Sequence, residues 1–162
     1  MKHIISVVVR NNSGVLARVS SLFGRRGFNI DSLSVSATDD SRISRITVVV
    51  NGDDAELEQV VKQTAKLVDT ISVTALAEVD SVCRELILVK VVSFTDVFDK
   101  QIVAITDLFG GLILDISAKS MIIELTGENK KIDEFTRALV ENADGKYRIE
   151  RVCRTGITAM PR

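Results

Sequence analysis

Asparagine and glycine residues near the start of the chain have the spacing of a binding site for a small zwitterion. Asn11 follows an apolar run over residues 4–9, Gly14 opens an amphipathic segment, and Asn29 precedes the next apolar segment. An amide side chain offers an acceptor to an ammonium group and donors to a carboxylate. The first amides of a helix beginning near Gly14 would lack internal partners and carry the positive end of the helix dipole. Such a helix start suits a carboxylate, and glycine lets a ligand approach the backbone closely.

Apolar side chains accompany these polar groups and narrow the expected ligand. Val15, Leu16 and Ile30 lie directly beside them in the sequence, which favours a ligand with a branched aliphatic side chain. The alternative is a set of turn-forming residues and a helix cap without a ligand, a role that asparagine and serine often fill. The candidate binding residues are Asn11, Gly14, Val15, Leu16, Asn29 and Ile30.

Other kinds of chemistry find little support in the sequence. A phosphate loop would want more glycines and a Gly-Lys-Ser/Thr ending, whereas Gly14 is followed by Val-Leu. The H-E-x-x-H, C-x-x-C and G-x-S-x-G patterns are absent, and Cys83 and Cys153 lack metal-type spacing. His3 is the only histidine, near the first apolar run, and is expected to be a spectator. We therefore expect no catalytic residue, metal or cofactor in this chain.

The first half of the chain predicts a strand, a helix, two strands, a helix and a strand. The helix after Gly14 has its apolar residues at i, i+1, i+4, i+7 and i+8, which is typical of one buried face. Ser32, Ser34 and Ser36 alternate with apolar residues and indicate a strand with one polar face. Asp53 is placed to cap the second helix. The predicted strands are residues 3–10, 29–38, 43–50 and 71–76, and the helices begin near residues 15 and 54.

The second half repeats the same order of elements. Leu22-Phe23-Gly24 precedes the second strand of the first half, and Leu108-Phe109-Gly110 does so in the second. The predicted strands are residues 84–92, 113–117, 121–126 and 147–154, with helices over 97–109 and around 132–140. Each half thus has the βαββαβ order of a ferredoxin-like sandwich. We predict an α+β protein of two tandem ferredoxin-like sandwiches, residues 1–78 and 84–162, with the linker near residues 78–83.

Only the first half carries the candidate binding residues. The corresponding corner of the second half reads Ser93-Phe94-Thr95-Asp96 and lacks the Asn-x-x-Gly pattern. The counterpart of Asn29 falls near Leu112 or Ile113, whose side chains cannot hydrogen-bond an amino acid. We therefore assign the ligand site to residues 1–78.

The segment Asn11–Leu33 also resembles a known family. Its run Asn-x-x-Gly-Val-Leu-x-Arg-Val-x-x-Leu-Phe-x-Arg-Arg-Gly-Phe-Asn-Ile-x-Ser-Leu is similar to the small regulatory subunit of acetolactate synthase (acetohydroxyacid synthase), whose N-terminal part is an ACT domain. The resemblance covers nearly the whole chain. It implies a non-catalytic subunit that activates a thiamine-diphosphate-dependent catalytic subunit and confers feedback inhibition by valine or another branched-chain amino acid. Thiamine diphosphate, magnesium and FAD would then belong to the large catalytic subunit.

Two other classes of function remain open on the sequence. An ACT-type amino-acid sensor could regulate a different enzyme or a transcription factor, although no helix-turn-helix segment is visible. A small hydrolase similar to acylphosphatase could be built on the same sandwich, because a fold does not fix a function. The hydrolase would show turnover by the isolated chain.

Charge and composition limit the partners and the compartment. The formal net charge is −1, from 21 basic and 22 acidic residues, so we expect no binding to nucleic acid. No apolar run approaches the ~20 residues that span a bilayer, so we expect no membrane association and a cytoplasmic location. Cys83 and Cys153 are expected to be reduced, buried or half-buried, and close together. The strand over residues 29–38 lies at a sheet edge in this fold, and its Leu33 and Val35 favour pairing into a homodimer.

Overall fold

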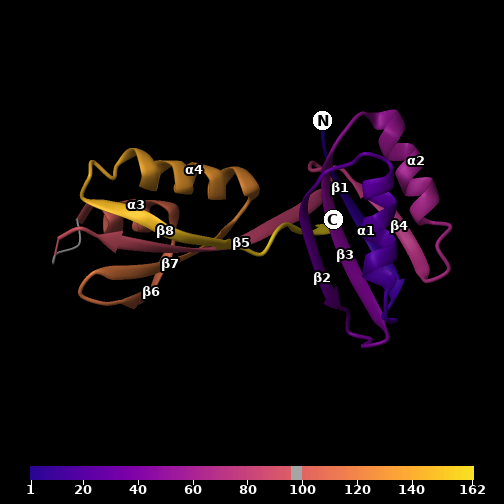
Figure 1. The fold of residues 1–162 in the computed structure, drawn as a ribbon, viewed down its shortest axis with the longest axis horizontal. Helices are drawn as coiled ribbons and strands as arrows, with labels where there is room; N and C mark the ends of the chain where they lie inside the picture. Colours follow the sequence, from indigo (N-terminus) through magenta and orange to yellow (C-terminus); the bar gives the residue numbers. More distant parts are fainter. Residues whose placement is uncertain (96–99) are drawn as a thin grey trace. The chain divides into compact units, whose positions relative to one another are not determined.

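The computed structural model describes residues 1–95 and 100–162 and divides into two compact units (Figure 1). The first unit consists of Met1–Cys83 together with Gly156–Arg162, and the second of Arg84–Thr155. Within the described part of the chain, no helix has the length and apolar character needed to cross a membrane.

The first unit has the predicted βαββαβ order. The elements are β1 (Lys2–Arg10), α1 (Val15–Arg25), β2 (Ile30–Ala37), β3 (Ile43–Asn51), α2 (Asp54–Thr64) and β4 (Thr70–Leu76). The sheet order is β2-β3-β1-β4, and all neighbouring strands are antiparallel. The strand predicted over residues 29–38 is thus confirmed as an edge strand.

The second unit repeats the plan, with its sheet in the order β6-β7-β5-β8. The predicted α+β fold of two ferredoxin-like sandwiches is confirmed. The predicted start of the third helix, Val97 and Phe98, lies outside the described residues. The elements are β5 (Ser81–Ser93), α3 (Lys100–Phe109), β6 (Leu112–Ile116), β7 (Ser120–Gly127), α4 (Asn129–Glu141) and β8 (Tyr147–Arg154).

Each unit has its own apolar core between one face of its sheet and its helices. Apolar residues of α1 and α2 pack on alternate residues of β1 and β3, and those of α3 and α4 pack on β5 and β7. Phe23 and Phe135 are the largest of the fully buried side chains, one in each core. Because aromatic residues are few, the cores depend on Val, Ile and Leu, as the composition predicts.

The end of the chain returns to the first unit, which was not predicted. Residues 156–162 include the short strand β9 (Thr158–Pro161), which pairs with β5. Ile157 and Ala159 pack with Ile4, Val49 and Leu76 on the sheet face opposite α1 and α2. The open face of this sheet is thus partly covered by the chain's own end.

Two serines of β2 hold this returning segment. The Ile157 N–H donates to Ser32 Oγ at 3.0 Å, and Ser34 Oγ donates to the Ile157 carbonyl at 2.7 Å. Gly156 has φ 78°, and a Cβ on it would lie 2.4 Å from Ser32 Oγ. The polar face of β2 was predicted correctly, but its serines bind the end of the chain.

The prediction that Cys83 and Cys153 lie close together is wrong, although both are free thiols as expected. β8 does run antiparallel to β5, but the register places Cys153 opposite Leu88. Cys83 lies five positions further along β5, roughly 16 Å at the rise of an extended strand. Cys153 is exposed rather than buried or half-buried, whereas Cys83 is partly buried. Antiparallel pairing predicts the neighbour strand, but alternation of apolar residues does not predict the register.

Candidate functional site

The start of α1 is an exposed turn with open backbone amides. Gly14 precedes the helix with φ 78° and ψ 0°, a left-handed conformation that favours glycine. No side chain caps the helix, whereas the Asp53 side chain caps α2 by accepting the Glu56 N–H at 2.7 Å. The Val15 N–H donates to the Asn12 carbonyl at 3.4 Å. The next amides, those of Leu16 and Ala17, have no partner within the helix and carry the positive end of its dipole.

Open amides alone do not define a site, because α4 also begins without a side-chain cap. What distinguishes α1 is the exposed asparagine beside it. Asn11 Nδ2 donates to the Ser41 carbonyl at 2.9 Å, and the Asn11 N–H donates to the Arg42 carbonyl at 2.7 Å. The first bond orients the side-chain amide and the second holds the Asn11 backbone, so the lone pairs of Oδ1 stay available to a donor.

Asp69, which sequence reasoning missed, fastens the turn before α1. Asn12 Nδ2 donates to Asp69 Oδ1 at 2.8 Å, and Arg18 Nη2 lies 2.5 Å from Asp69 Oδ2. The hydrogen bond from Asn12 lowers the pKa of Asp69, the Arg18 guanidinium adds to this, and partial desolvation opposes it. The carboxylate thus ties the loop before α1 to the loop before β4. Asp69 lies 57 residues from Asn12, so no local pattern could have revealed it.

Asn29 and Ile30 occupy the other end of the same sheet. Asn29 is exposed, and its Nδ2 lies 3.4 Å from Asp31 Oδ1; Asp31 also accepts a hydrogen bond from the Asn51 amide. Ile30 is partly buried against the core. Its backbone pairs with Val50 near the end of β3.

The six candidate residues therefore do not meet in one corner of one chain. Arg10, next to Asn11, pairs with Ile43 at the start of β3, whereas Ile30 pairs with Val50. The two positions on β3 are seven residues apart, roughly 20 Å or more along an extended strand. Asn11, Gly14, Val15 and Leu16 lie at one end of the sheet, and Asn29 and Ile30 at the other.

The two apolar residues after Gly14 differ in exposure. Val15 was expected to supply apolar surface to a ligand, but its side chain is buried in the core. Leu16 is 41% exposed and does offer such surface. At this end of the sheet, the groups open to a ligand are the Asn11 amide, the first amides of α1 and the Leu16 side chain.

The fold and the sequence of both units match known protein families. Residues 5–72 match the AHAS small subunit-like ACT domain, which makes the first unit an ACT domain. Residues 84–162 match the model described as the small subunit of acetolactate synthase. The chain belongs to the acetolactate synthase small-subunit family.

Individual relatives agree with this assignment over the full length of the chain. A probable acetolactate synthase small subunit of Archaeoglobus fulgidus is 46% identical over 100% of this chain and 98% of its own length. The acetolactate synthase small subunit of Haemophilus influenzae is 41% identical over 100% of this chain and 96% of its own length. The crystal structure of the small subunit from Thermotoga maritima has a TM-score of 0.87 at 37% identity, covering 100% of this chain and 98% of that one.

Proposed function

We propose that this chain is a non-catalytic regulatory subunit of acetolactate synthase. It activates the large catalytic subunit and confers feedback inhibition by valine or another branched-chain amino acid. The observation that carries the proposal is the exposed, uncapped start of α1 beside the oriented Asn11 amide. An α-amino acid presents a carboxylate and an ammonium group together, and this end of the sheet offers donors to the first and an acceptor to the second.

The effector site is shared by two copies of the chain. Asn11 and Asn29 lie at opposite ends of one sheet, but β2 is an edge strand and runs parallel to β1. If two β2 strands pair antiparallel across a two-fold axis, the start of one lies beside the end of the other. Asn29 of one copy then approaches Asn11 and Gly14 of its mate. This arrangement brings the candidate residues together and makes the homodimer the form that binds the effector.

The catalytic chemistry belongs to the partner in this proposal. Among residues 1–95 and 100–162, no three His, Cys, Asp or Glu side chains are grouped so that they could hold a metal ion. We assign thiamine diphosphate, magnesium and FAD to the large subunit. We place the complex in the cytoplasm, where free thiols such as Cys83 and Cys153 stay reduced.

The test is acetolactate production by the reconstituted large and small subunits with increasing valine, leucine or isoleucine. Asn29→Ala should remove a polar contact to the effector, about 1–3 kcal/mol if that contact is buried in the dimer. This corresponds to roughly 5- to 150-fold weaker inhibition. Gly14→Asp should abolish inhibition, because its carboxylate would occupy the place of the effector's own. Activation of the large subunit should persist in both variants.

Controls separate the site from the fold. Asn142→Ala makes the same change in the second unit and should leave the inhibition curve unchanged. Gly14→Asp adds strain at φ 78°, so circular dichroism must show that it folds. Unchanged inhibition in both Asn29→Ala and Gly14→Asp would place the effector elsewhere.

Light scattering at micromolar concentration with effector present should give a dimer, and a strict monomer would contradict the shared site. A pull-down that recovers a different enzyme would favour an amino-acid sensor of another pathway.

A further inference from the structure

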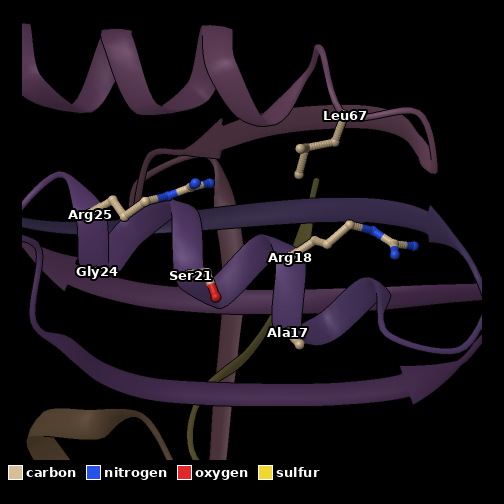
Figure 2. Close-up of a pocket in the computed structure, with 6 residues that line it drawn as sticks. All are labelled: Ala17, Arg18, Ser21, Gly24, Arg25 and Leu67. Carbon is tan, nitrogen blue, oxygen red and sulfur yellow. The ribbon is translucent and has the colours of Figure 1, made fainter.

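A groove along the exposed side of α1 is not used by the proposed effector site. It is lined by Ala17, Arg18, Ser21, Gly24, Arg25 and Leu67, and a neighbouring depression continues it over Leu22, Arg26 and Gln63. We call this surface the arginine groove. Figure 2 shows its small residues along α1, with the Arg18 and Arg25 side chains extending toward the side on which Leu67 lies.

The groove is positively charged in a chain that is slightly acidic overall. α1 contains Arg18 and Arg25 and no acidic residue, and Arg26 follows directly, although the net charge of the chain is −1. Arg18 is paired with Asp69, and Arg26 Nε donates to Gln63 Oε1 at 3.0 Å. Arg25 has no hydrogen-bond or ion-pair partner within the part of the chain that the structure describes. Two of the three guanidinium groups are therefore not neutralised by a carboxylate of their own unit.

A structural role explains only part of this arrangement. Arginines in the last turn of a helix are favoured by the helix dipole, which accounts for Arg25 and Arg26 at the end of α1. Asp69 accounts for Arg18, but neither the dipole nor this ion pair accounts for the hollow between the arginines. The floor of that hollow, made by Ala17, Ser21 and Gly24, has short side chains or none and lets another backbone approach closely.

We propose that the arginine groove binds an acidic segment of the large catalytic subunit. This inference rests on the proposed function, since it takes the large subunit as the partner. The planar guanidinium fork binds carboxylates through two parallel hydrogen bonds, and arginine is enriched at protein interfaces. The groove follows α1 from residue 17 to residue 26, roughly 14 Å at the rise of a helix. That length fits several residues of a polypeptide and exceeds a single carboxylate or phosphate ion.

The two arginines chosen for the test, Arg25 and Arg26, are not among the six candidate effector residues. Arg25 and Arg26 lie at the end of α1, and Gly14 and the open amides lie at its start. A change at Arg25 and Arg26 should therefore reduce association with the large subunit and leave Asn11, Gly14 and Leu16 in place, although Arg26 lies three positions before Asn29. Arg18 should be left unchanged in the test because it holds Asp69 next to the effector end.

The experiment measures the affinity of the full-length chain for the acetolactate synthase large subunit of the same organism, by biolayer interferometry at low and high salt. Arg25→Glu combined with Arg26→Glu should weaken association roughly tenfold or more at low salt, because two attractions become repulsions. The difference should shrink at high salt. Ser21→Trp fills the groove without changing its charge and should weaken association as well. Arg137→Glu is the matched control, an exposed arginine on α4 of the second unit.

Each outcome bears on the inference separately from the proposed function. If the parent chain does not bind the large subunit at all, the proposed function fails and this inference fails with it. If the parent binds and both groove variants bind equally well, only the inference is overturned. Equal weakening by Arg137→Glu would mean a general effect of charge and would also overturn it. If Arg25→Glu/Arg26→Glu loses binding of inorganic phosphate but keeps the large subunit, the groove is a small-anion site and the inference is overturned. Circular dichroism checks that each variant folds. If Arg25→Glu/Arg26→Glu does not fold, the affinity of Ser21→Trp decides the test.

Discussion

The two units end their first helix with the same hydrogen-bonded motif but continue it with different residues. In each unit a glycine with positive φ follows the helix, Gly27 at 79° and Gly110 at 68°. The amide of this glycine and the amide after it donate to carbonyls of the last turn, which is the Schellman arrangement. These bonds are Gly27 N–H to Gly24 O at 3.0 Å, Phe28 N–H to Phe23 O at 3.1 Å, Gly110 N–H to Asp107 O at 3.0 Å and Gly111 N–H to Thr106 O at 2.8 Å.

This shared motif shows which residues of the two units correspond. By this motif, Phe28 corresponds to Gly111 and Asn29 corresponds to Leu112. The repeated Leu-Phe-Gly sequence would instead align Gly24 with Gly110, three residues away from the match that the structure gives. A repeated tripeptide is therefore a weaker guide to equivalence than the hydrogen bonds at a helix end.

The residues that follow the glycine give each unit a different surface. Phe28 is buried and meets the Phe23 ring edge-on, with ring centroids 6.4 Å apart, and its ring fills the space where Gly52 lacks a side chain. Gly111 allows close packing instead, since a Cβ there would lie 3.0 Å from the Glu124 carbonyl. After them, the first unit presents the polar Asn29 and the second the apolar Leu112. This difference agrees with the prediction that the ligand site lies in the first unit.

The largest expected effect comes from removing the ring that the second unit lacks. Phe28→Ala should lower the free energy of unfolding of the first unit by about 3–4 kcal/mol, because a buried aromatic side chain leaves a cavity. Urea denaturation followed by circular dichroism measures the change. Phe94→Ala removes an aromatic ring that is 59% exposed and should change the free energy of unfolding by less than about 0.5 kcal/mol. Similar losses in both variants would contradict the role of Phe28 as a core residue.

A second difference between the units is the position of their ionic networks. In the first unit, Asp69 bonds Asn12 and Arg18 at the surface. In the second, the buried Glu85 accepts two hydrogen bonds from Arg154, each of 2.7 Å, and a third from Asn129 at 3.1 Å. Glu85 and the neighbouring Asp133 raise the pKa of Arg154, and the hydrogen bonds that Arg154 donates to Glu85 contribute most. The surface network orients a loop, and the buried network joins β5, β8 and α4.

Glu85→Ala should destabilise the second unit by about 3 kcal/mol, the lower end of the range for breaking a buried ion pair. The lower end applies because the Arg154 side chain is partly exposed and keeps Asp133 at 2.8 Å. The chain has no Trp and one Tyr, and Tyr147 is buried in this unit, so tyrosine fluorescence during urea denaturation reports the second unit. Glu134→Ala removes an exposed acid of α4 and should leave the tyrosine transition in place. An unchanged transition in Glu85→Ala would show that the buried pair contributes no net stability.

The surface network should make a smaller contribution that depends on pH. Because the pKa of Asp69 is lowered in the folded chain, its contribution is present above the unfolded pKa, about 3.9, and is lost as the pH falls through the folded value. Asp69→Asn should therefore be less stable than the parent at pH 6, and the difference should shrink as the pH falls below the unfolded pKa. Urea midpoints at a series of pH values measure this. A difference that grows on acidification would have the wrong sign and would contradict the assigned cause.

The sequence predicts the fold well because strand order follows from a repeated local pattern. Alternation of apolar residues locates the strands, and the βαββαβ order then implies the antiparallel neighbours that the structure contains. β9 was missed because it is a four-residue strand ending in a proline. Its placement depends on Ser32 and Ser34, more than 120 residues away. Long-range partners of this kind leave no periodic signal.

The candidate site was predicted less completely. The residue types were chosen from the helix start, and the left-handed Gly14 and the uncapped α1 agree with that reasoning. The prediction did not take into account that β1 and β2 run parallel. Parallel strands place the end of β1 and the start of β2 at opposite ends of the sheet. Whether two copies bring Asn11 and Asn29 together stays a prediction. The burial of Val15 follows from its place on the inner face of α1, next to Val19.

The smallest expected effect tests whether one asparagine is enough to make a site. Leu112→Asn places the counterpart of Asn29 in the second unit, at an exposed position on an edge strand. We expect no new effector binding, because Ser93, Phe94 and Thr95 stand where the first unit has its Asn-x-x-Gly turn. Calorimetric titration with valine should give the same number of sites per chain as the parent. Stability should change by less than about 0.5 kcal/mol, as is usual for surface substitutions. An additional binding event in Leu112→Asn would mean that the residue after the helix, rather than the uncapped start of α1, determines where the effector binds.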